Sequence, residues 1–367
     1  MIASRFFVIS ATILAFGFSF AGGATAAPTQ ANAAAAALTI TNAWSRGVAH
    51  PTFGVSQSSP ISVMRSGVPQ VIVADSGGRL YSFDRATGAV TWSRSLSVSS
   101  VLAPLSTNGT SIFAGLTSHT ATTSTVGAYS VASGATAWGG NRCAHCMQLG
   151  GATVSGNELA VGSAQSHVFG LAASTGGMHW KYRNTDSINS TPAVADLYGN
   201  GSHQWIFTTD QTGNSLVRPP ALPGGHLRIF SAQGQEICNA NIGGGVLPTG
   251  SFDSSPAVVS FGSGSMIVFG TGESGSNSKR LLVFNSACQK IWISPQLAGM
   301  TVGAPAVADT EGTGTPVVIE EVANSAGHPV VYKVDIRNQR IIASKTLTGC
   351  NHFRLFCRSR GWLFMII

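Results

Sequence analysis

Charged residues are scarce in this chain of 367 residues, of which Asp, Glu, Lys and Arg make up only 10%. The chain has 21 basic and 14 acidic residues. Arg5 and three arginines beyond position 349 account for four of the basic residues, which leaves 17 against all 14 acids in residues 38–349. That central part has no long run of like charge, so neither a basic groove nor nucleic acid as a partner is expected.

Several catalytic motifs are also missing. The sequence has no Gly-x-Ser-x-Gly nucleophile elbow, no His-Glu-x-x-His pair and no phosphate-binding loop. The histidines at 145, 167, 179, 203 and 226 are scattered along the chain, and structural or surface roles outweigh catalysis for them. We therefore assign no catalytic residue and lean against an enzyme.

No hydrophobic run in the sequence is long enough to be a clear membrane span. The longest covers residues 6–20 and is interrupted by Ser10, Thr12 and Ser19. With Arg5 before it and the small residues 24–26 after it, the run predicts a signal peptide over residues 1–27 and an Ala-rich linker over 28–37. A secreted, periplasmic or cell-surface protein without a membrane span after cleavage is expected, and an uncleaved anchor is the alternative.

Glycine, in contrast, is abundant, with 44 residues that follow no collagen-like period. Many short β-branched runs lie between the glycines, which is typical of a turn-rich all-β protein. The clearest example comprises residues 70–74, a turn at 75–78, residues 79–84, a second turn at 86–88, and residues 89–93. These runs predict hairpin strands rather than helices.

A four-residue step from a turn residue to a tryptophan recurs along the chain. It joins Gly88 to Trp92, Gly134 to Trp138 and Gly176 to Trp180, and recurs in altered form as Gly234–Cys238, Cys288–Trp292 and Asn338–Ile342. With Trp44 added, successive anchor positions are 48, 46, 42, 58, 54 and 50 residues apart. Such periods favour β-propeller blades. The turn position requires a positive φ, for which Asn338 is a natural substitute and Cys288 a less comfortable one.

Residues 81–92, Tyr-Ser-Phe-Asp-Arg-Ala-Thr-Gly-Ala-Val-Thr-Trp, resemble the PQQ-like (quinoprotein) propeller repeat. Residues 190–201 are similar to the FG-GAP type of repeat. The likeness covers residues 38–348 and implies four antiparallel strands per blade, with each tryptophan packed between neighbouring blades. It does not decide activity, because enzymes and scaffolds both use such repeats. The structural anchors are expected to be Trp44, Trp92, Trp138, Trp180, Trp292, Gly88, Gly134, Gly176 and Gly234.

The two ends of the predicted ring do not match. Residues 38–44 form one strand without the rest of a blade, and such a strand closes many propellers by pairing with the last blade. Residues 349–367 do not continue the repeat and are read as an atypical tail. We expect six recognisable blades plus a lone N-terminal closing strand, seven-bladed if complete, with truncation or a frameshift near 349 as the hypothesis. The alternative is a six-bladed ring with residues 38–44 on an outer edge.

Six cysteines in an exported protein suggest disulfides. Cys143 and Cys146 form a Cys-x-x-Cys motif, for which a local disulfide or loop thiols is preferred over a metal or redox site. Cys238 replaces a blade tryptophan and Cys288 the turn glycine of the next blade, so a disulfide between blades is a further expectation. Two unrelated buried thiols are the alternative.

The loops at 196–201 and 309–314 retain one and two carboxylates. Calcium needs six to eight oxygen ligands, so both are expected to be simple turns, and no metal site is assigned. The function expected is a non-catalytic, monomeric scaffold that binds an unknown protein or small ligand on one propeller face, at loops including 211–225 and 272–278. The alternatives are a PQQ-dependent oxidoreductase, with PQQ and calcium as its cofactors, and a remnant of one.

Overall fold

The computed structural model describes residues 5–9, 44, 46–48, 58–96, 101, 103–116, 125–139, 150–163, 167–184, 188–209, 225–242, 254–261, 264–272, 278–301, 303–347 and 362–366. These parts contain strands and turns, and none of them holds a helix that could cross a membrane. The all-β prediction is confirmed, with six four-stranded antiparallel sheets. The predicted leader and linker lie mostly outside these residues and stay predictions.

The first three sheets take up residues 61–183. The first has β2 (Ile61–Arg65), β3 (Val68–Asp75), β4 (Arg79–Asp84) and β5 (Val90–Ser95). The second has β6 (Ser106–Thr107), β7 (Ser111–Leu116), β8 (Thr125–Ser130) and β9 (Thr136–Trp138). The third has β10 (Thr153–Ser155), β11 (Glu158–Ser163), β12 (His167–Ala172) and β13 (Met178–Arg183).

The other three sheets repeat this order. The fourth has β14 (Ala193–Ala195), β15 (Gln204–Thr209), β16 (His226–Ser231) and β17 (Glu236–Asn241). The fifth has β18 (Ala257–Phe261), β19 (Gly264–Gly270), β20 (Leu281–Asn285) and β21 (Lys290–Ile293). The sixth has β22 (Ala306–Ala308), β23 (Val317–Ala323), β24 (Pro329–Asp335) and β25 (Arg340–Thr346).

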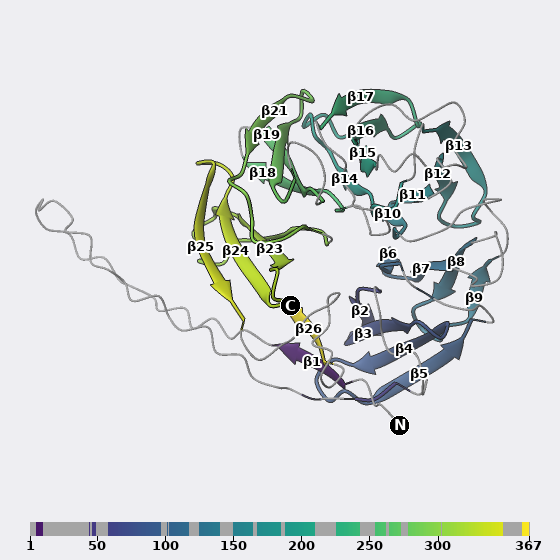
Figure 1. Cartoon of the computed structure of the whole chain (residues 1–367). Helices are drawn as coiled ribbons and strands as arrows, with labels where there is room; N and C mark the ends of the chain where they lie inside the picture. Colours follow the sequence, from purple (N-terminus) through teal and green to yellow (C-terminus); the bar gives the residue numbers. More distant parts are fainter. Residues whose placement is uncertain are drawn as a thin grey trace, which may run out of the picture.

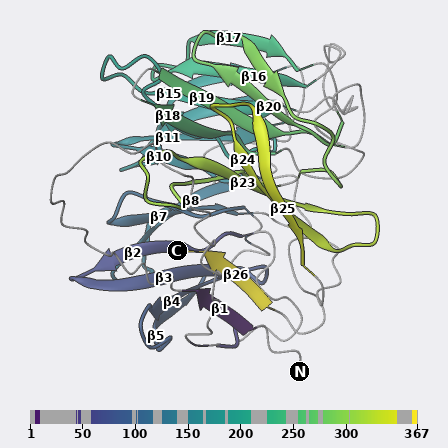
Figure 2. The same ribbon diagram turned by 90° about the vertical axis from the view of Figure 1, so that its left-hand side faces the viewer.

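The sheets stand side by side around a common centre, with the first strand of each innermost and the fourth outermost (Figure 1). Successive first strands contact one another from β2 through β22. Between the sixth sheet and the first, the described strands leave the ring open (Figures 1 and 2). At this open side lies a two-stranded parallel pair, β1 (Arg5–Ile9) with β26 (Trp362–Ile366). This pair joins part of the predicted leader to part of the predicted tail.

The hydrophobic core lies in the interfaces between neighbouring sheets, which we call seams. Alternate residues of a strand point to opposite faces of its sheet, so each sheet contributes to two seams. In β3, Ile72 and Ala74 pack with the second sheet, whereas Val71 and Val73 pack on the other face against Trp44. Each seam has its own cluster of buried aliphatic and aromatic side chains. Burial of apolar side chains on the faces of the sheets therefore holds neighbouring sheets together.

Three seams, and the face of the first sheet that Trp44 covers, carry the same contact between a tryptophan and a glycine. The indole Nε1 donates to a carbonyl oxygen in the next sheet's third turn, and the ring covers that turn's glycine. The four contacts are Trp44 with Arg85 O at 2.8 Å, Trp92 with Val131 O at 3.0 Å, Trp138 with Ala173 O at 2.7 Å and Trp180 with Ala232 O at 3.0 Å. The covered glycines are Gly88, Gly134, Gly176 and Gly234, all with positive φ.

A Cβ on any of these glycines would lie under 3.0 Å from the indole ring. The glycine is therefore required twice, by the backbone conformation and by the ring above it. Trp292 lies in the seam between the fifth and sixth sheets, among buried aliphatic residues of both. Of the predicted closing strand 38–44 only Trp44 is described, and it is not part of a strand.

The last repeat is shifted by one residue from the sequence expectation. In the turn between β24 and β25 of the sixth sheet, the residue with positive φ is Gln339, not Asn338. The strand register also places Ala343, opposite Lys333, where the other sheets have their tryptophan, so Ile342 is not the anchor. The prediction was wrong because Ile342 occupies the bulge that precedes each anchor. The four-residue step itself is kept, from Gln339 to Ala343.

The outer face of the sixth sheet differs from the matching faces of the others. Glu321, Lys333 and Lys345 share this face with Ala343, as the register shows. In the first sheet the matching positions hold Ala74, Ser82 and Arg94, around Trp92. Along β25 every residue except Ile341 is exposed, and this strand faces the viewer in Figure 2. Charged side chains and an alanine thus stand where an apolar seam with a tryptophan would otherwise form.

Candidate functional site

The antiparallel strand order places the variable connections on one side of the ring. In each sheet, the connection from the second to the third strand and the one from the fourth strand to the next sheet lie at the same strand ends. We call this side the loop face. The longest connections that leave and return on it are 210–225, 242–256 and 139–152. The predicted binding loops 211–225 and 272–278 fall within connections that leave and return on this face, and most of their residues lie outside the described parts.

The seam between the third and fourth sheets departs from the repeat. Arg228 in β16 occupies a position that has uncharged residues in every other sheet. In the third strand of each sheet, this is the residue directly before the one that pairs with the anchor position. In the other five sheets it is Tyr81, Gly127, Phe169, Leu282 and Tyr332. Arg228 is nevertheless only 2% exposed. Burial of an unpaired guanidinium is very unfavourable, so this charge must have partners.

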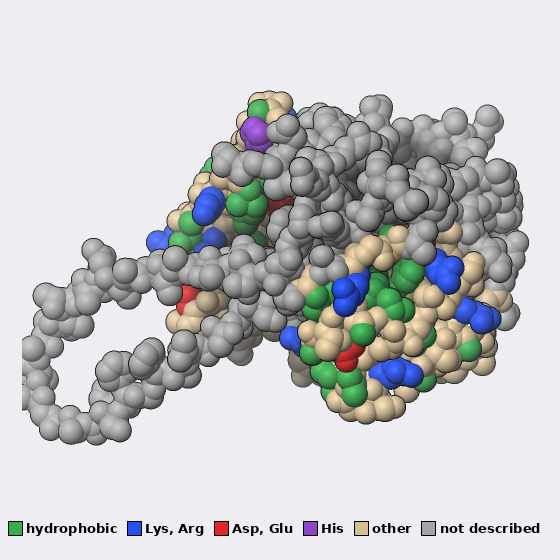
Figure 3. All heavy atoms as spheres, turned by 90° about the horizontal axis from the view of Figure 1, so that it is seen from below, with side chains coloured by type: hydrophobic (Ala, Val, Ile, Leu, Met, Phe, Trp, Pro, Cys, Tyr) green, Lys and Arg blue, Asp and Glu red, His purple; other side chains and the backbone are tan. Residues whose placement is uncertain are grey.

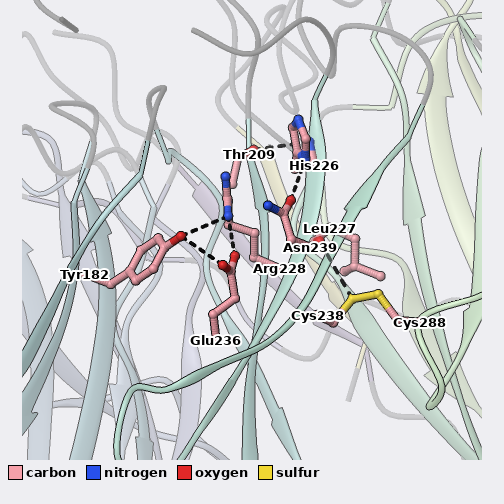
Figure 4. A network of polar contacts seen from close by, with 9 residues as sticks. All are labelled: Tyr182, Thr209, His226, Leu227, Arg228, Glu236, Cys238, Asn239 and Cys288. Carbon is pink, nitrogen blue, oxygen red and sulfur yellow. Dashed lines mark hydrogen bonds and ion pairs between the residues drawn. A yellow bond between two sulfur atoms is a disulfide. The ribbon is translucent and has the colours of Figure 1, made fainter. Parts of the chain in front are cut away.

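Those partners come from both sides of the seam (Figure 4). Arg228 Nη1 forms an ion pair with Glu236 Oε1 and donates a hydrogen bond to Tyr182 Oη at 3.2 Å. Tyr182 Oη in turn donates to Glu236 Oε2 at 3.0 Å. Tyr182 belongs to β13 and Glu236 to β17, so the triangle ties the third sheet to the fourth. The Arg228 guanidinium also lies 5.6 Å from the centre of the Tyr182 ring.

The burial of this triangle perturbs the tyrosine. Burial raises the pKa of Tyr182, and the nearby Arg228 charge opposes that rise. The phenol therefore keeps its proton at neutral pH and remains a donor to Glu236. One side of the Arg228 guanidinium is fully used by these contacts. Its Nε is buried and has no hydrogen-bond partner among the described residues.

His226 extends the network toward the loop face. It begins β16 directly after the 210–225 connection and is 8% exposed. Its backbone N–H donates to Thr209 Oγ1 at 3.1 Å, and its Nδ1 lies 2.6 Å from Asn239 Oδ1. With the amide oxygen as acceptor, Nδ1 carries the proton. Burial lowers the pKa of His226, and its Nε2 is buried without a partner in the described structure.

The neighbouring seam, between the fourth and fifth sheets, has a disulfide in place of the tryptophan and glycine. Cys238 and Cys288 are joined, with their Cα atoms 5.9 Å apart. Cys288 has a φ of 65°, so it takes the turn glycine's backbone conformation as well as its place. Cys238 is 5% exposed, and the pair lies against the buried aliphatic cluster of this seam. Cys143 and Cys146 lie outside the described residues.

The FG-GAP-like loops are closed by their own carboxylates. Asp196 accepts hydrogen bonds from Asn200 N at 3.1 Å and Gly201 N at 2.6 Å, and Asp309 accepts from the equivalent Thr313 N and Gly314 N. These hydrogen bonds lower the pKa of both carboxyls. Within the described ranges no three His, Cys, Asp or Glu side chains gather to hold a metal ion.

Sequence reasoning missed the Arg228 network. A single arginine in an otherwise apolar strand was the available signal, because every other repeat has an uncharged residue at that position. Its partners could not be found from the sequence, since Tyr182 is 46 residues away and belongs to another repeat. A second buried charge, Glu320 in β23, was missed in the same way. Burial raises its pKa well above the ordinary value, and Glu321 adds to the shift.

Comparison with known proteins agrees with the fold. No curated protein matches the sequence at a significant level. Among solved structures, BamB from Moraxella catarrhalis is similar with a TM-score of 0.56 and 17% identity, over 84% of this chain and 81% of that one. A europium-containing methanol dehydrogenase has a TM-score of 0.58 and 11% identity, over 84% of this chain and 73% of that one. At such identities the likeness concerns the fold alone.

A protein-family model gives the more specific result. The model described as outer membrane protein assembly factor BamB matches residues 41–237 and 122–355, which together span most of the chain. This range contains all six sheets, the tryptophan–glycine contacts and the Arg228 network. The chain therefore belongs to the BamB-like family of PQQ-type β-propeller repeat proteins.

Proposed function

We propose that this protein is an exported, non-catalytic propeller that binds a partner protein through its loop face. The observation that carries the proposal is that the connections between strands are short on one side of the ring and long on the other. Short turns, four of them with a tryptophan–glycine contact, lie on one side, and the strands joined by the long connections 139–152, 210–225 and 242–256 end and begin on the other. Rigid frames that present variable loops on one face are typical of binding proteins. The family's relation to BamB, an assembly factor by description, supports the same role.

The surface of the described residues is compatible with such a role. On the side shown in Figure 3, Lys and Arg side chains are scattered among uncharged groups and do not form a stripe. The disulfide between Cys238 and Cys288 supports an oxidising, extracytoplasmic location. The signal peptide over residues 1–27 is part of the proposal and accounts for export.

Site-specific cross-linking tests this function. A photoreactive residue is placed at Gln296, in the connection from the fifth sheet to the sixth on the loop face, and in a matched protein at Gln233, in a turn on the opposite side of the ring; both positions are exposed. The full-length protein is expressed in its native host with its own leader. We expect a discrete cross-linked partner at Gln296 and none at Gln233. Equal cross-linking at both, or none at either, would contradict binding through the loop face.

The second candidate is a PQQ-dependent oxidoreductase, which the fold-level likeness to a methanol dehydrogenase favours. It predicts a change in the quinone absorbance of PQQ when the protein and calcium are added. It also predicts reduction of a dye acceptor with alcohols or sugars. We expect neither signal, and a saturable absorbance change with turnover would favour the enzyme over the scaffold.

A further inference from the structure

We propose that Arg228 and His226 form a carboxylate-binding site in the seam between the third and fourth sheets. The inference deepens the proposed function and rests on it in one respect, since the carboxylate would belong to the bound partner. Two buried polar side chains on one strand lack partners at defined atoms, Arg228 Nε and His226 Nε2. They are two residues apart on β16, so they point to the same face of the sheet.

The chemistry of these two atoms selects the ligand. The Nη1 side of the guanidinium is occupied by Glu236 and Tyr182, which leaves the planar edge that begins at Nε. Such an edge matches the two oxygens of a carboxylate, and a buried Arg–carboxylate contact is strong. Glu236 leaves this edge free to bind a second carboxylate, because it bonds to Nη1 alone among the guanidinium nitrogens.

Charge balance then fixes the role of His226. Arg228 and Glu236 cancel, and His226 is neutral, since burial and the Arg228 charge lower its pKa. A bound carboxylate would make the cluster negative. If His226 Nε2 takes one proton from solvent, it becomes a donor to the carboxylate and the cluster is neutral again. Binding should therefore be accompanied by the uptake of one proton.

The charged and titratable groups around His226 agree with this account. The described charged groups that interact with His226 are Arg228 and Glu236, both from its own sheet, and Tyr182 of the third sheet contacts those two groups. Tyr182 stays neutral because burial raises its pKa, so only Arg228 and Glu236 contribute charge. Asn239, which holds Nδ1, is exposed and lies at the outer rim of the seam.

The experiment follows His226 by histidine NMR, with the signal assigned by its loss in His226→Gln. Succinate represents a small acid, and N-acetylglutamate N-methylamide represents a protein side chain. Succinamide is the uncharged control. We expect both carboxylates to shift the His226 signal toward the protonated form, whereas succinamide leaves it unchanged. Affinity should fall about tenfold for each pH unit above the pKa of free His226, because one proton is taken up. The tighter of the two ligands indicates the natural source.

Variants separate the site from general structure. Arg228→Lys keeps the charge but loses the planar edge, and should weaken binding at least about tenfold. Arg228→Gln combined with Glu236→Gln leaves no unpaired charge, and should abolish binding while the protein unfolds near the wild-type temperature. His203→Gln is the matched control. His203 Nε2 is also buried without a partner, but it lies beside β15 at the opposite end of the same sheet, so binding should be unchanged.

Two results would overturn the proposal. A His226 signal that carboxylates do not move would refute the site, and cross-linking at Gln296 would then still support the loop-face function. Binding that survives the double variant would place the carboxylate elsewhere. Carboxylate binding without any cross-linked partner would support the site and contradict the interaction function, so the two proposals fail separately.

Discussion

The disulfide between Cys238 and Cys288 should be interchangeable with the tryptophan–glycine contact used at other seams. The test compares two double variants, Cys238→Ser with Cys288→Ser, and Cys238→Trp with Cys288→Gly. The first removes the cross-link and leaves the seam without an anchor. The second installs the anchor of the neighbouring repeats. Its turn has the same length as the one at Gly234, which accommodates Trp180, and Cys288 already has the φ that glycine favours.

The size of the effect follows from the sequence separation of 50 residues between the two cysteines. Closing a loop of this length in the unfolded chain corresponds to about 4 kcal/mol at 25 °C in the chain-entropy account, and measured values are typically about 2–4 kcal/mol. For a propeller of about 300 residues, with an unfolding entropy of about 2.1 cal/mol/K per residue, this lowers Tm by about 3–6 °C. The Trp–Gly variant should recover much of the loss, because a buried indole is worth about 3–5 kcal/mol relative to alanine.

The assay is thermal and urea unfolding, followed by circular dichroism with and without dithiothreitol. Mass spectrometry establishes the state of the bond. Dithiothreitol supplies two electrons and two protons to convert the disulfide to two thiols. Replacing Cys143 and Cys146 by serine in every protein restricts the effect to this pair. Wild type should lose stability on reduction, and the Trp–Gly variant should not respond. If wild type is equally stable once reduced, or if the Trp–Gly variant is no better than the serine pair, the reasoning fails.

Three further predictions concern single side chains. Trp92→Ala should destabilise by about 3–5 kcal/mol through loss of its seam contacts, and an unchanged thermal midpoint would argue against a packing role. Gly134→Ala should lower the midpoint because its Cβ would meet the Trp92 ring, whereas Gly109→Ala, also at positive φ but with open space, should cost only about 1 kcal/mol. Glu320 has a raised pKa when folded, so its contribution is favourable below the unfolded pKa and is lost as pH rises through the folded value. Glu320→Gln should therefore stabilise increasingly with pH in urea titrations, and a pH-independent difference would contradict this.

The sequence was sufficient to predict the architecture because one contact is repeated with little change. Trp92 and Gly134 are 42 residues apart, yet each is identified by its place in its own repeat. The contact depends on a large ring and on the absence of a side chain, which are both visible in a single sequence. The same logic applied to Cys238 and Cys288, because both positions changed together. The sequence pattern predicts a seam contact well when two fixed positions of the repeat make that contact.

The sequence was a poorer guide where geometry depends on backbone details or on distant partners. Asn338 is a better residue for positive φ than Gln339, and propensity alone selects it. The bulge in β25 instead sets the positions of Gln339 and Ala343, since strand register outweighs the preference of one side chain. Arg228 illustrates the second limit. Its burial is tolerable only because Tyr182 and Glu236 meet it, and nothing in the local sequence indicates that meeting.

The departures from the repeat differ in kind, and the differences carry functional information. Ala343 and the charged residues around it replace an apolar seam on the sixth sheet's outer face, where exposure makes the substitutions inexpensive. Cys238 and Cys288 exchange one anchor for another at a closed seam. Arg228 introduces a charge, with an ion-pair partner, into a closed seam that could have been apolar, and apolar replacement of buried ion pairs is often neutral or stabilising. Stability therefore does not account for Arg228. Its Nε and the His226 Nε2, both without a partner among the described residues, are instead suited to binding a ligand.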